Sequence, residues 1–263
     1  MIGLPKNRLD LENPQLLQHP LFRGLRTGII FMDNSKFCRD LVRKNGSTTL
    51  SSTAPVWSYS EYGWQANMSV GSGIITGWNS IELDWQNFTF MVWASTISTL
   101  TTRENLMGCK VATAEEIRFG RNSDNFYFYV RTPSETRIMS NDIANHNDGN
   151  IHCFGGTSAP TGCAQYFDGV QTGTALAATS NLGDVTDWVE IGDNGAGDEW
   201  EGDITLALGW DRGLSAEEMN LLYRMGPNLT LVNDRIEMPY YGALGTGAAT
   251  FNAAWAYNSN QVL

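Results

Sequence analysis

Two carboxylates, Glu82 and Asp84, stand two positions apart and are the strongest candidates in the chain for acid–base chemistry. Side chains alternate between the two faces of a strand, so this spacing would place both carboxylates on one face. Hydrolysis of a glycosidic bond with retention also needs a second carboxyl group that protonates the leaving oxygen. The next polar residues are Gln86 and Asn87, and neither amide can supply that proton. We therefore predict that this stretch does not catalyse a reaction and that the protein is not an enzyme.

A second group of oxygen-bearing side chains could bind a hard cation. Asp193, Asn194, Asp198 and Glu199 carry the oxygen ligands that Ca²⁺ prefers, and Asp168 could lie near them. Their spacing follows no regular calcium-binding pattern, and acidic loops also occur as solvated turns. The sequence leaves both interpretations open, a calcium site and a solvated loop.

Zinc binding and nucleophilic catalysis have little support. The three histidines are not spaced four apart, the four cysteines form no C-x-x-C pair, and the chain has no G-x-S-x-G turn. Cys153 and Cys163 would face each other if a hairpin turned at Ser158. Because the first residues lack the apolar segment of a secretory signal, two reduced thiols are favoured over a disulfide.

Tryptophan and asparagine side chains alternate in the region that precedes residue 88. An aromatic ring can stack on a sugar while neighbouring amides bind its hydroxyl groups, which makes a carbohydrate-binding face a reasonable hypothesis. The same rings could instead fill the core or anchor a subunit interface. The candidate sugar-binding residues are Trp57, Trp64, Trp78, Trp85, Asn67 and Asn79.

The composition favours a single large β domain. The 263 residues include 27 glycines, 11% aromatic residues and only 17% charged residues, which suits short strands joined by tight turns. The formal net charge of −11 makes nucleic acid an unfavourable partner. The longest apolar run is far too short to span a membrane, so no membrane partner is expected.

Alternation of apolar and polar residues predicts strands at 29–31, 63–68, 88–94, 116–120 and 125–130. Both faces of 88–94 are largely apolar, which predicts a central strand that is covered on both sides. Ser215 and Glu218 form a capping box, and the apolar spacing after them predicts one short helix from Ser215 to about Met225, ended by Gly226.

Several motifs resemble the laminin-G-like domains of the concanavalin A-like lectin and glucanase superfamily. The stretch 166–169 resembles the Y-x-D-G turn of that family, 189–192 resembles its x-I-G strand, and 212–219 resembles its R-x-L-S-x-x-E-I helix start. At the other end, 19–25 resembles the opening N-P-L-x-x-G-L.

The resemblance implies an all-β fold, an antiparallel β-sandwich of the jelly-roll type with one short helix. The sandwich would span 19–227, between an N-terminal arm at 1–18 and a C-terminal arm or added strand at 228–263. The stretch 148–152 resembles the family's D-G-x-W-H strand entry, with Ile151 in the place of tryptophan. Retaining β-glucanases of the same fold carry paired acids on one strand, but here 82–87 corresponds to the turn before the strand at 88.

The resemblance extends to domains encoded by bacteriophages, in part through the tail 255–263. It implies a structural protein of the virion, such as a capsid decoration, head fibre or tail-associated protein, made in the host cytoplasm and assembled with copies of itself and with a capsid. Adhesion to surface glycans would be compatible with that role. The alternative is a carbohydrate-binding module or a Ca²⁺-dependent lectin, and a β-glucanase-like hydrolase is a third, weaker alternative.

Overall fold

The computed structural model describes residues 20–31, 38–40, 42, 49–50, 55–60, 63–69, 72–79, 82–97, 103–112, 115–122, 125–132, 135–143, 146–175, 177, 188–193 and 198–227. The arms predicted at 1–18 and 228–263 lie outside these residues, as do Asn194 and the tail at 255–263. None of the described residues forms a helix with the length and hydropathy needed to cross a membrane.

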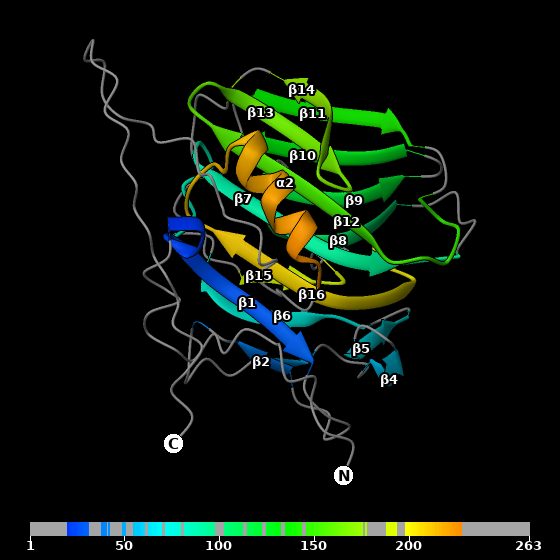
Figure 1. Ribbon diagram of the computed structural model, residues 1–263. Helices are drawn as coiled ribbons and strands as arrows, with labels where there is room; N and C mark the ends of the chain where they lie inside the picture. The colour runs from blue at the N-terminus through cyan, green and yellow to red at the C-terminus, as the bar shows by residue number, and fades with distance from the viewer. Residues whose placement is uncertain are drawn as a thin grey trace, which may run out of the picture. The chain divides into compact units, whose positions relative to one another are not determined.

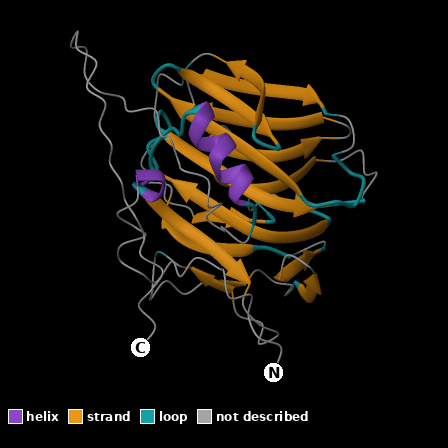
Figure 2. Ribbon diagram, viewed as in Figure 1, coloured by secondary structure: helices purple, strands orange, loops and turns teal. Residues whose placement is uncertain are grey.

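Two antiparallel sheets form a sandwich, which confirms the predicted all-β fold (Figure 1). In the described ranges, sheet A has nine strands and sheet B has seven. Helix α2 (Ala216–Met225) lies across the outer side of sheet A, as Figures 1 and 2 show. The short 3-10 helix η1 (Pro20–Phe22) precedes the first strand.

Both sheets combine pairs of consecutive strands with pairs of strands that are distant in the sequence, as expected for a jelly-roll-like sandwich. Sheet A runs in the order β14 (Val170–Ala175), β13 (Gly162–Phe167), β12 (His152–Ala159), β7 (Phe88–Ser95), β16 (Gly202–Trp210), β1 (Leu25–Phe31), β5 (Gly63–Met68) and β4 (Val56–Ser60), and β2 (Cys38–Asp40) pairs with β1. Sheet B runs in the order β11 (Glu135–Asp142), β10 (Asn125–Thr132), β9 (Glu115–Asn122), β8 (Arg103–Ala112), β15 (Trp188–Ile191), β6 (Ile74–Asn79) and β3 (Thr49–Leu50).

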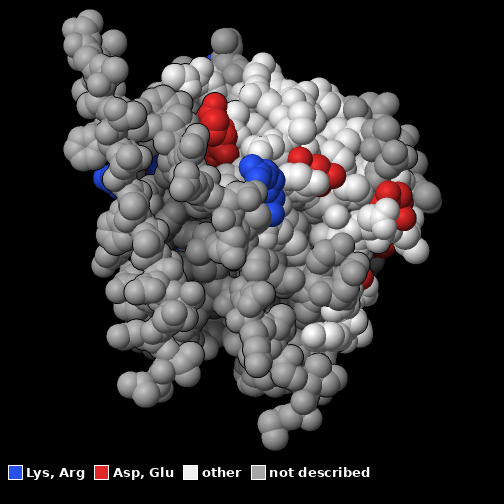
Figure 3. All heavy atoms as spheres, viewed as in Figure 1, with Lys and Arg blue, Asp and Glu red and all other residues white. Residues whose placement is uncertain are grey.

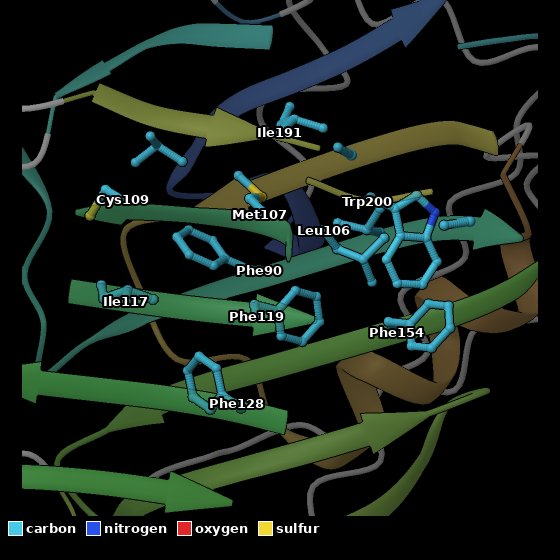
Figure 4. Packing of buried hydrophobic residues seen from close by; sticks show 14 of the residues in the cluster. Phe90, Leu106, Met107, Cys109, Ile117, Phe119, Phe128, Phe154, Ile191 and Trp200 are labelled. Carbon is cyan, nitrogen blue, oxygen red and sulfur yellow. The ribbon is translucent and has the colours of Figure 1, made fainter. Parts of the chain in front are cut away.

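Strand β7 is buried on both faces along its whole length, as its sequence predicts. Phe90 and Val92 face the other sheet and belong to the main core, whose packing with Phe119 and Trp200 is seen in Figure 4. Met91 and Trp93 face the opposite way, into a second apolar cluster. Sheet A therefore needs an apolar cover on its outer side.

Helix α2 and η1 supply that cover. Met219, Leu222 and Met225 of the helix and Leu21 and Phe22 of η1 belong to the second cluster. The predicted capping box is present: the Ser215 hydroxyl accepts a hydrogen bond from the Glu218 amide, and the Glu218 carboxylate accepts one from the Ser215 amide. The helix ends at Gly226, which has a positive φ of 69°. The helix prediction is confirmed at both ends.

The β12–β13 hairpin does not bring Cys153 and Cys163 opposite each other, in agreement with the favoured interpretation of two reduced thiols. The chain turns at Pro160 and Thr161 rather than at Ser158, so Cys163 pairs with Ser158. Cys153 instead belongs to the second apolar cluster, and Cys163 belongs to the main core on the other face of the sheet. Both thiols are buried, and they form no disulfide because they lie on opposite faces of the sheet.

Candidate ligand-binding face on sheet B

The outward side of sheet B carries charged and aromatic side chains instead of an apolar cover. On β9, Ile117 and Phe119 point into the main core. Because side chains alternate along a strand, Glu116 and Arg118 point outward between them. A helix covers part of the outer side of sheet A, whereas the outer side of sheet B carries polar side chains, of which Glu116 and Arg118 are themselves buried.

Arg118 is the centre of this polar face. Its Nε donates to Glu116 Oε2 at 2.8 Å, and its Nη1 donates to the Asp198 carboxylate. The side chains of Arg118 and Glu116 are only 9% and 4% exposed. Arg131 Nη1 lies 3.9 Å from Glu116 Oε1 and adds a second positive charge at the open side.

The two carboxylates keep Arg118 charged despite its burial. Burial works against the charged guanidinium, but the hydrogen bond to Glu116 and the negative charges of Glu116 and Asp198 outweigh it and raise the pKa of Arg118 above its ordinary value. The carboxylates of Glu116 and Asp198 are therefore both paired with the Arg118 guanidinium, which stays positively charged.

Tyr127 and Asn105 connect this cluster to the segment that follows Asp198. The Tyr127 hydroxyl donates to Asn105 Oδ1 at 2.8 Å, and Asn105 Nδ2 donates to the Asp198 carbonyl at 3.1 Å. Burial raises the pKa of Tyr127, so its phenol stays neutral and can donate. The cluster holds residue 198 in place beside β8.

The same face continues toward the other edge of the sheet with more exposed groups. Val189 and Ile191 of β15 are buried in the main core, so Trp188 and Glu190 alternate outward, and Trp188 is 44% exposed. Asn79 of β6 is the register partner of Trp188. We call the following residues the sheet-B face: Asn79, Lys110, Glu116, Arg118, Tyr127, Tyr129, Trp188 and Glu190.

The structure separates the residues predicted to bind sugar. Trp78 and Trp85 are fully buried in the main core, so neither ring can stack on a sugar and the prediction for them is wrong. Trp57 is half-buried and packs against the same core from sheet A. Asn67 Nδ2 donates to Asp203 Oδ1 at 3.0 Å. Of Trp64 only the backbone, in β5, is described.

Asn79 is the one predicted sugar-binding residue that lies on the sheet-B face. The other members were missed by sequence reasoning. The signal that could have found them is the alternation of charged and apolar residues at 116–119, because charges on a central strand need partners.

Four of the five residues predicted to bind Ca²⁺ are described, and these four do not form a cation site. Asp198 forms a salt bridge with Arg118, and Asp193 is buried. The backbone of Glu199 forms an isolated parallel β-bridge with Asn105. In the ranges that the structure describes, no group of three or more His, Cys, Asp and Glu side chains is arranged to hold a metal ion.

Asp168 is bound to protein groups at the β13–β14 turn. Its Oδ1 accepts the Cys153 amide at 2.8 Å, and its Oδ2 lies 2.8 Å from His152 Nδ1. His152 Nε2 lies 3.2 Å from Asp148 Oδ1, so the ring stands between two carboxylates. The turn requires a positive φ of 48° at Asp168, which aspartate tolerates better than most residues.

The His152 cluster predicts a pH-dependent contribution to stability. The hydrogen bond to Asp168 raises the pKa of His152, burial opposes this, and the charge of Asp168 and the contact with Asp148 add to the rise. A raised folded-state pKa gives stability that is complete below the ordinary histidine pKa of about 6.5 and is lost as the pH rises through the folded value. We expect the melting temperature of wild type to exceed that of His152→Gln by more at pH 5.5 than at pH 8.5, measured by scanning calorimetry. An equal difference at both values would exclude a protonated His152.

Glu82 and Asp84 lie in the turn before β7, as the resemblance implied. Asp84 Oδ1 accepts the Gln86 amide at 3.0 Å, and the Asp84 carbonyl accepts the Asn87 amide at 2.8 Å. Both side chains are exposed. Their surroundings are those of a solvated turn.

Comparison with known proteins identifies the fold. No protein-family model matches the chain, and no curated protein sequence matches it. Among solved structures, domain 4 of AbnA, a GH43 extracellular arabinanase from Geobacillus stearothermophilus solved in complex with arabinotriose, matches with a TM-score of 0.62 and 13% identity. That match covers 76% of this chain and 98% of the other.

Two toxin domains are also similar. The binding domain of botulinum neurotoxin DC, solved in complex with SialylT, has a TM-score of 0.58 and 9% identity over 78% of this chain and 52% of the other. The binding domain of Paraclostridial Mosquitocidal Protein 1 has a TM-score of 0.58 and 13% identity, and the match covers 77% of this chain and 52% of the other. This chain therefore spans about half the length of the toxin domains. At such identities the likeness shows a shared β-sandwich fold.

Proposed function

We propose that this protein is a non-catalytic glycan-binding module and that an oligosaccharide binds on the sheet-B face. The observation that carries the proposal is the partly exposed ring of Trp188 beside Asn79, on a face that continues into charged and aromatic groups. An aromatic ring next to polar groups is the usual arrangement for sugar recognition. Two of the structural neighbours were solved with arabinotriose and with SialylT, which supports a ligand of this class.

The sheet-B face is wide enough to bind an extended ligand that lies across its strands. Asn79, Trp188, Lys110, Arg118 and Tyr129 come from five adjacent strands, β6, β15, β8, β9 and β10. Four strand spacings correspond to about 19 Å, which suits a chain of several sugars better than one monosaccharide. Because strands hold these side chains, the face is organised before the ligand arrives.

The surroundings of four carboxylates, Glu116, Asp198, Glu82 and Asp84, favour binding over catalysis. Glycosidases need one carboxylic acid that can release a proton and a second, ionised carboxylate. Here Glu116 and Asp198 both bind Arg118, and Glu82 and Asp84 lie in an exposed turn. We therefore propose recognition without hydrolysis.

The experiment is a glycan array with the full chain, followed by calorimetric titration of the strongest glycan. Trp188→Ala should weaken its affinity at least tenfold, because an aromatic anchor at the centre of a contact typically accounts for 2 kcal/mol or more. Tyr59→Ala is the matched control, since Tyr59 is 51% exposed but lies on β4 of sheet A. Equal affinities of the two variants would contradict the proposal.

We further propose that the module works as part of a bacteriophage virion, in contact with copies of itself and with a capsid. The supporting observation is that β4 is the edge strand of sheet A in the described residues and that its Val56 is 67% exposed. Such an edge can be extended by a strand from another chain. Co-sedimentation with phage particles at a fixed copy ratio would support this role, and sedimentation only as a free protein would contradict it.

A further inference from the structure

Two positively charged side chains lie on the sheet-B face, on either side of Glu116. The strand register pairs Glu116 of β9 with Lys110 of β8 and with Arg131 of β10. Cys109 and Val130 point into the main core. Their neighbours Lys110 and Arg131 therefore point outward, two strand spacings or about 9.6 Å apart at their backbones. A group that lies over Glu116 can meet both positive charges.

The carboxylate between the two cations does not neutralise them, because it is already bound. Arg118 Nε donates to Glu116 Oε2 at 2.8 Å, whereas Arg131 Nη1 lies 3.9 Å from Glu116 Oε1. Among the residues that the structure describes, none forms an ion pair with Lys110. The cations Lys110, Arg118 and Arg131 therefore stand against two carboxylates, Glu116 and Asp198, which leaves this part of the face positively charged.

Both outer cations are accessible to a ligand, in contrast to the carboxylate between them. The side chain of Arg131 is 38% exposed and that of Glu116 is 4% exposed. Lys110 is half-buried. Tyr129 is also half-buried and lies on the same side of β10 as Arg131, two positions earlier. An incoming anion therefore meets two cations and an aromatic ring before it meets Glu116.

The positive charge is local, since the formal net charge of the chain is −11. On the opposite face, over α2, the described residues show Asp and Glu side chains in several places and Lys and Arg side chains in fewer (Figure 3). On sheet B, Glu190 of β15 is separated from Arg118 by Gly108 of β8. The sheet-B face thus has a basic side on β8, β9 and β10, and an acidic residue close to Trp188.

We propose, on the basis of the function proposed above, that the glycan bound by the sheet-B face is acidic and that its carboxylate lies between Lys110 and Arg131. A carboxylate accepts charge-assisted hydrogen bonds from an ammonium and from a guanidinium, and such bonds are roughly twice as strong as those between neutral groups. The ring of Tyr129 can pack against the apolar side of the same sugar. A neutral sugar of the glycan then lies at Trp188.

The test uses the full chain and pairs of ligands that differ in charge. The pairs are trigalacturonic acid with its methyl ester, and sialyllactose with lactose. Binding is followed by NMR titration at the amides of β8, β9 and β10. We expect the acidic member of at least one pair to bind about tenfold more tightly than its neutral counterpart, and this preference to shrink as the salt concentration rises.

Two variants locate the carboxylate of the ligand. Lys110→Met and Arg131→Met should each lower the preference for the acidic ligand about threefold or more, because each removes one charge-assisted hydrogen bond. Arg23→Met is the matched control, since it makes the same change in net charge at an exposed residue between η1 and β1. It should leave the preference unchanged. The melting temperature of each variant shows that it is folded.

The outcomes separate the acidic class of ligand from glycan binding itself. Equal affinities within both pairs, with shifts on the sheet-B strands, would overturn the acidic class and leave the proposed function intact. A preference that Arg23→Met lowers as much as Arg131→Met would overturn the position of the carboxylate, because only the net charge would then matter. A glycan array without any ligand for these strands would contradict both proposals.

Discussion

Arg118→Met is expected to lower the free energy of unfolding by about 3–5 kcal/mol, because it leaves two carboxylates without their partner in a buried cluster. Arg118 binds Glu116 and Asp198 at once, and the side chain of Glu116 is 4% exposed. Methionine fills most of the space of the arginine stem, so the loss measures charge rather than volume. Urea unfolding followed by circular dichroism gives the value.

The control is Arg26→Met. Arg26 pairs with Asp211 at 2.6 Å, but the two side chains are 48% and 26% exposed, so its loss should cost about 1 kcal/mol or less. The triple variant Arg118→Met, Glu116→Gln, Asp198→Asn should recover much of the stability, because no buried charge is then left unpaired. Equal losses for Arg118→Met and Arg26→Met would contradict the central position of Arg118.

Gly120→Ala is expected to be the second large loss, at least 3 kcal/mol, which is the upper end of the range for overpacked sites. A Cβ at Gly120 would lie 1.9 Å from the Glu104 carbonyl oxygen and 2.9 Å from Asn105 Cα. Both atoms belong to the backbone of β8, so the strands themselves must separate. The sheet-B face would be disturbed at the same point, since Asn105 binds Tyr127.

Gly155→Ala provides the comparison for this substitution. Gly155 is also a buried strand glycine, but its new Cβ would first meet Met219 Cε at 2.3 Å, the flexible end of a side chain. Its cost should therefore be clearly smaller, measured as the difference in urea midpoint between the two variants. A similar loss of stability in both variants would show that the clash with the β8 backbone does not explain the effect of Gly120→Ala.

The fold was predictable where alternation was regular. Strand β7 and helix α2 were located correctly because their apolar spacing was uninterrupted. Strand β8 was missed, since its register shifts between Asn105 and Met107 and both Leu106 and Met107 become fully buried. A bulge breaks the period on which the prediction depends.

The candidate site was harder to predict because residue type does not report burial. Trp78 belongs to the same inward-facing series as Ile74, which a stricter use of alternation would have shown. The sequence predicted only a strand at 116–120, and Asp198, which pairs with Arg118, is 80 positions away in the sequence. Contacts of that separation depend on sheet order, which one sequence does not reveal.

The central claim is that an oligosaccharide lies on the sheet-B face. The most direct measurement is an NMR titration of the labelled wild-type chain with the strongest glycan from the array, recorded at the backbone amides and at the Trp188 indole. We predict the largest shifts on β15, β6, β8 and β9, with the Trp188 indole among them. Saturable binding that leaves those strands unchanged would contradict the account.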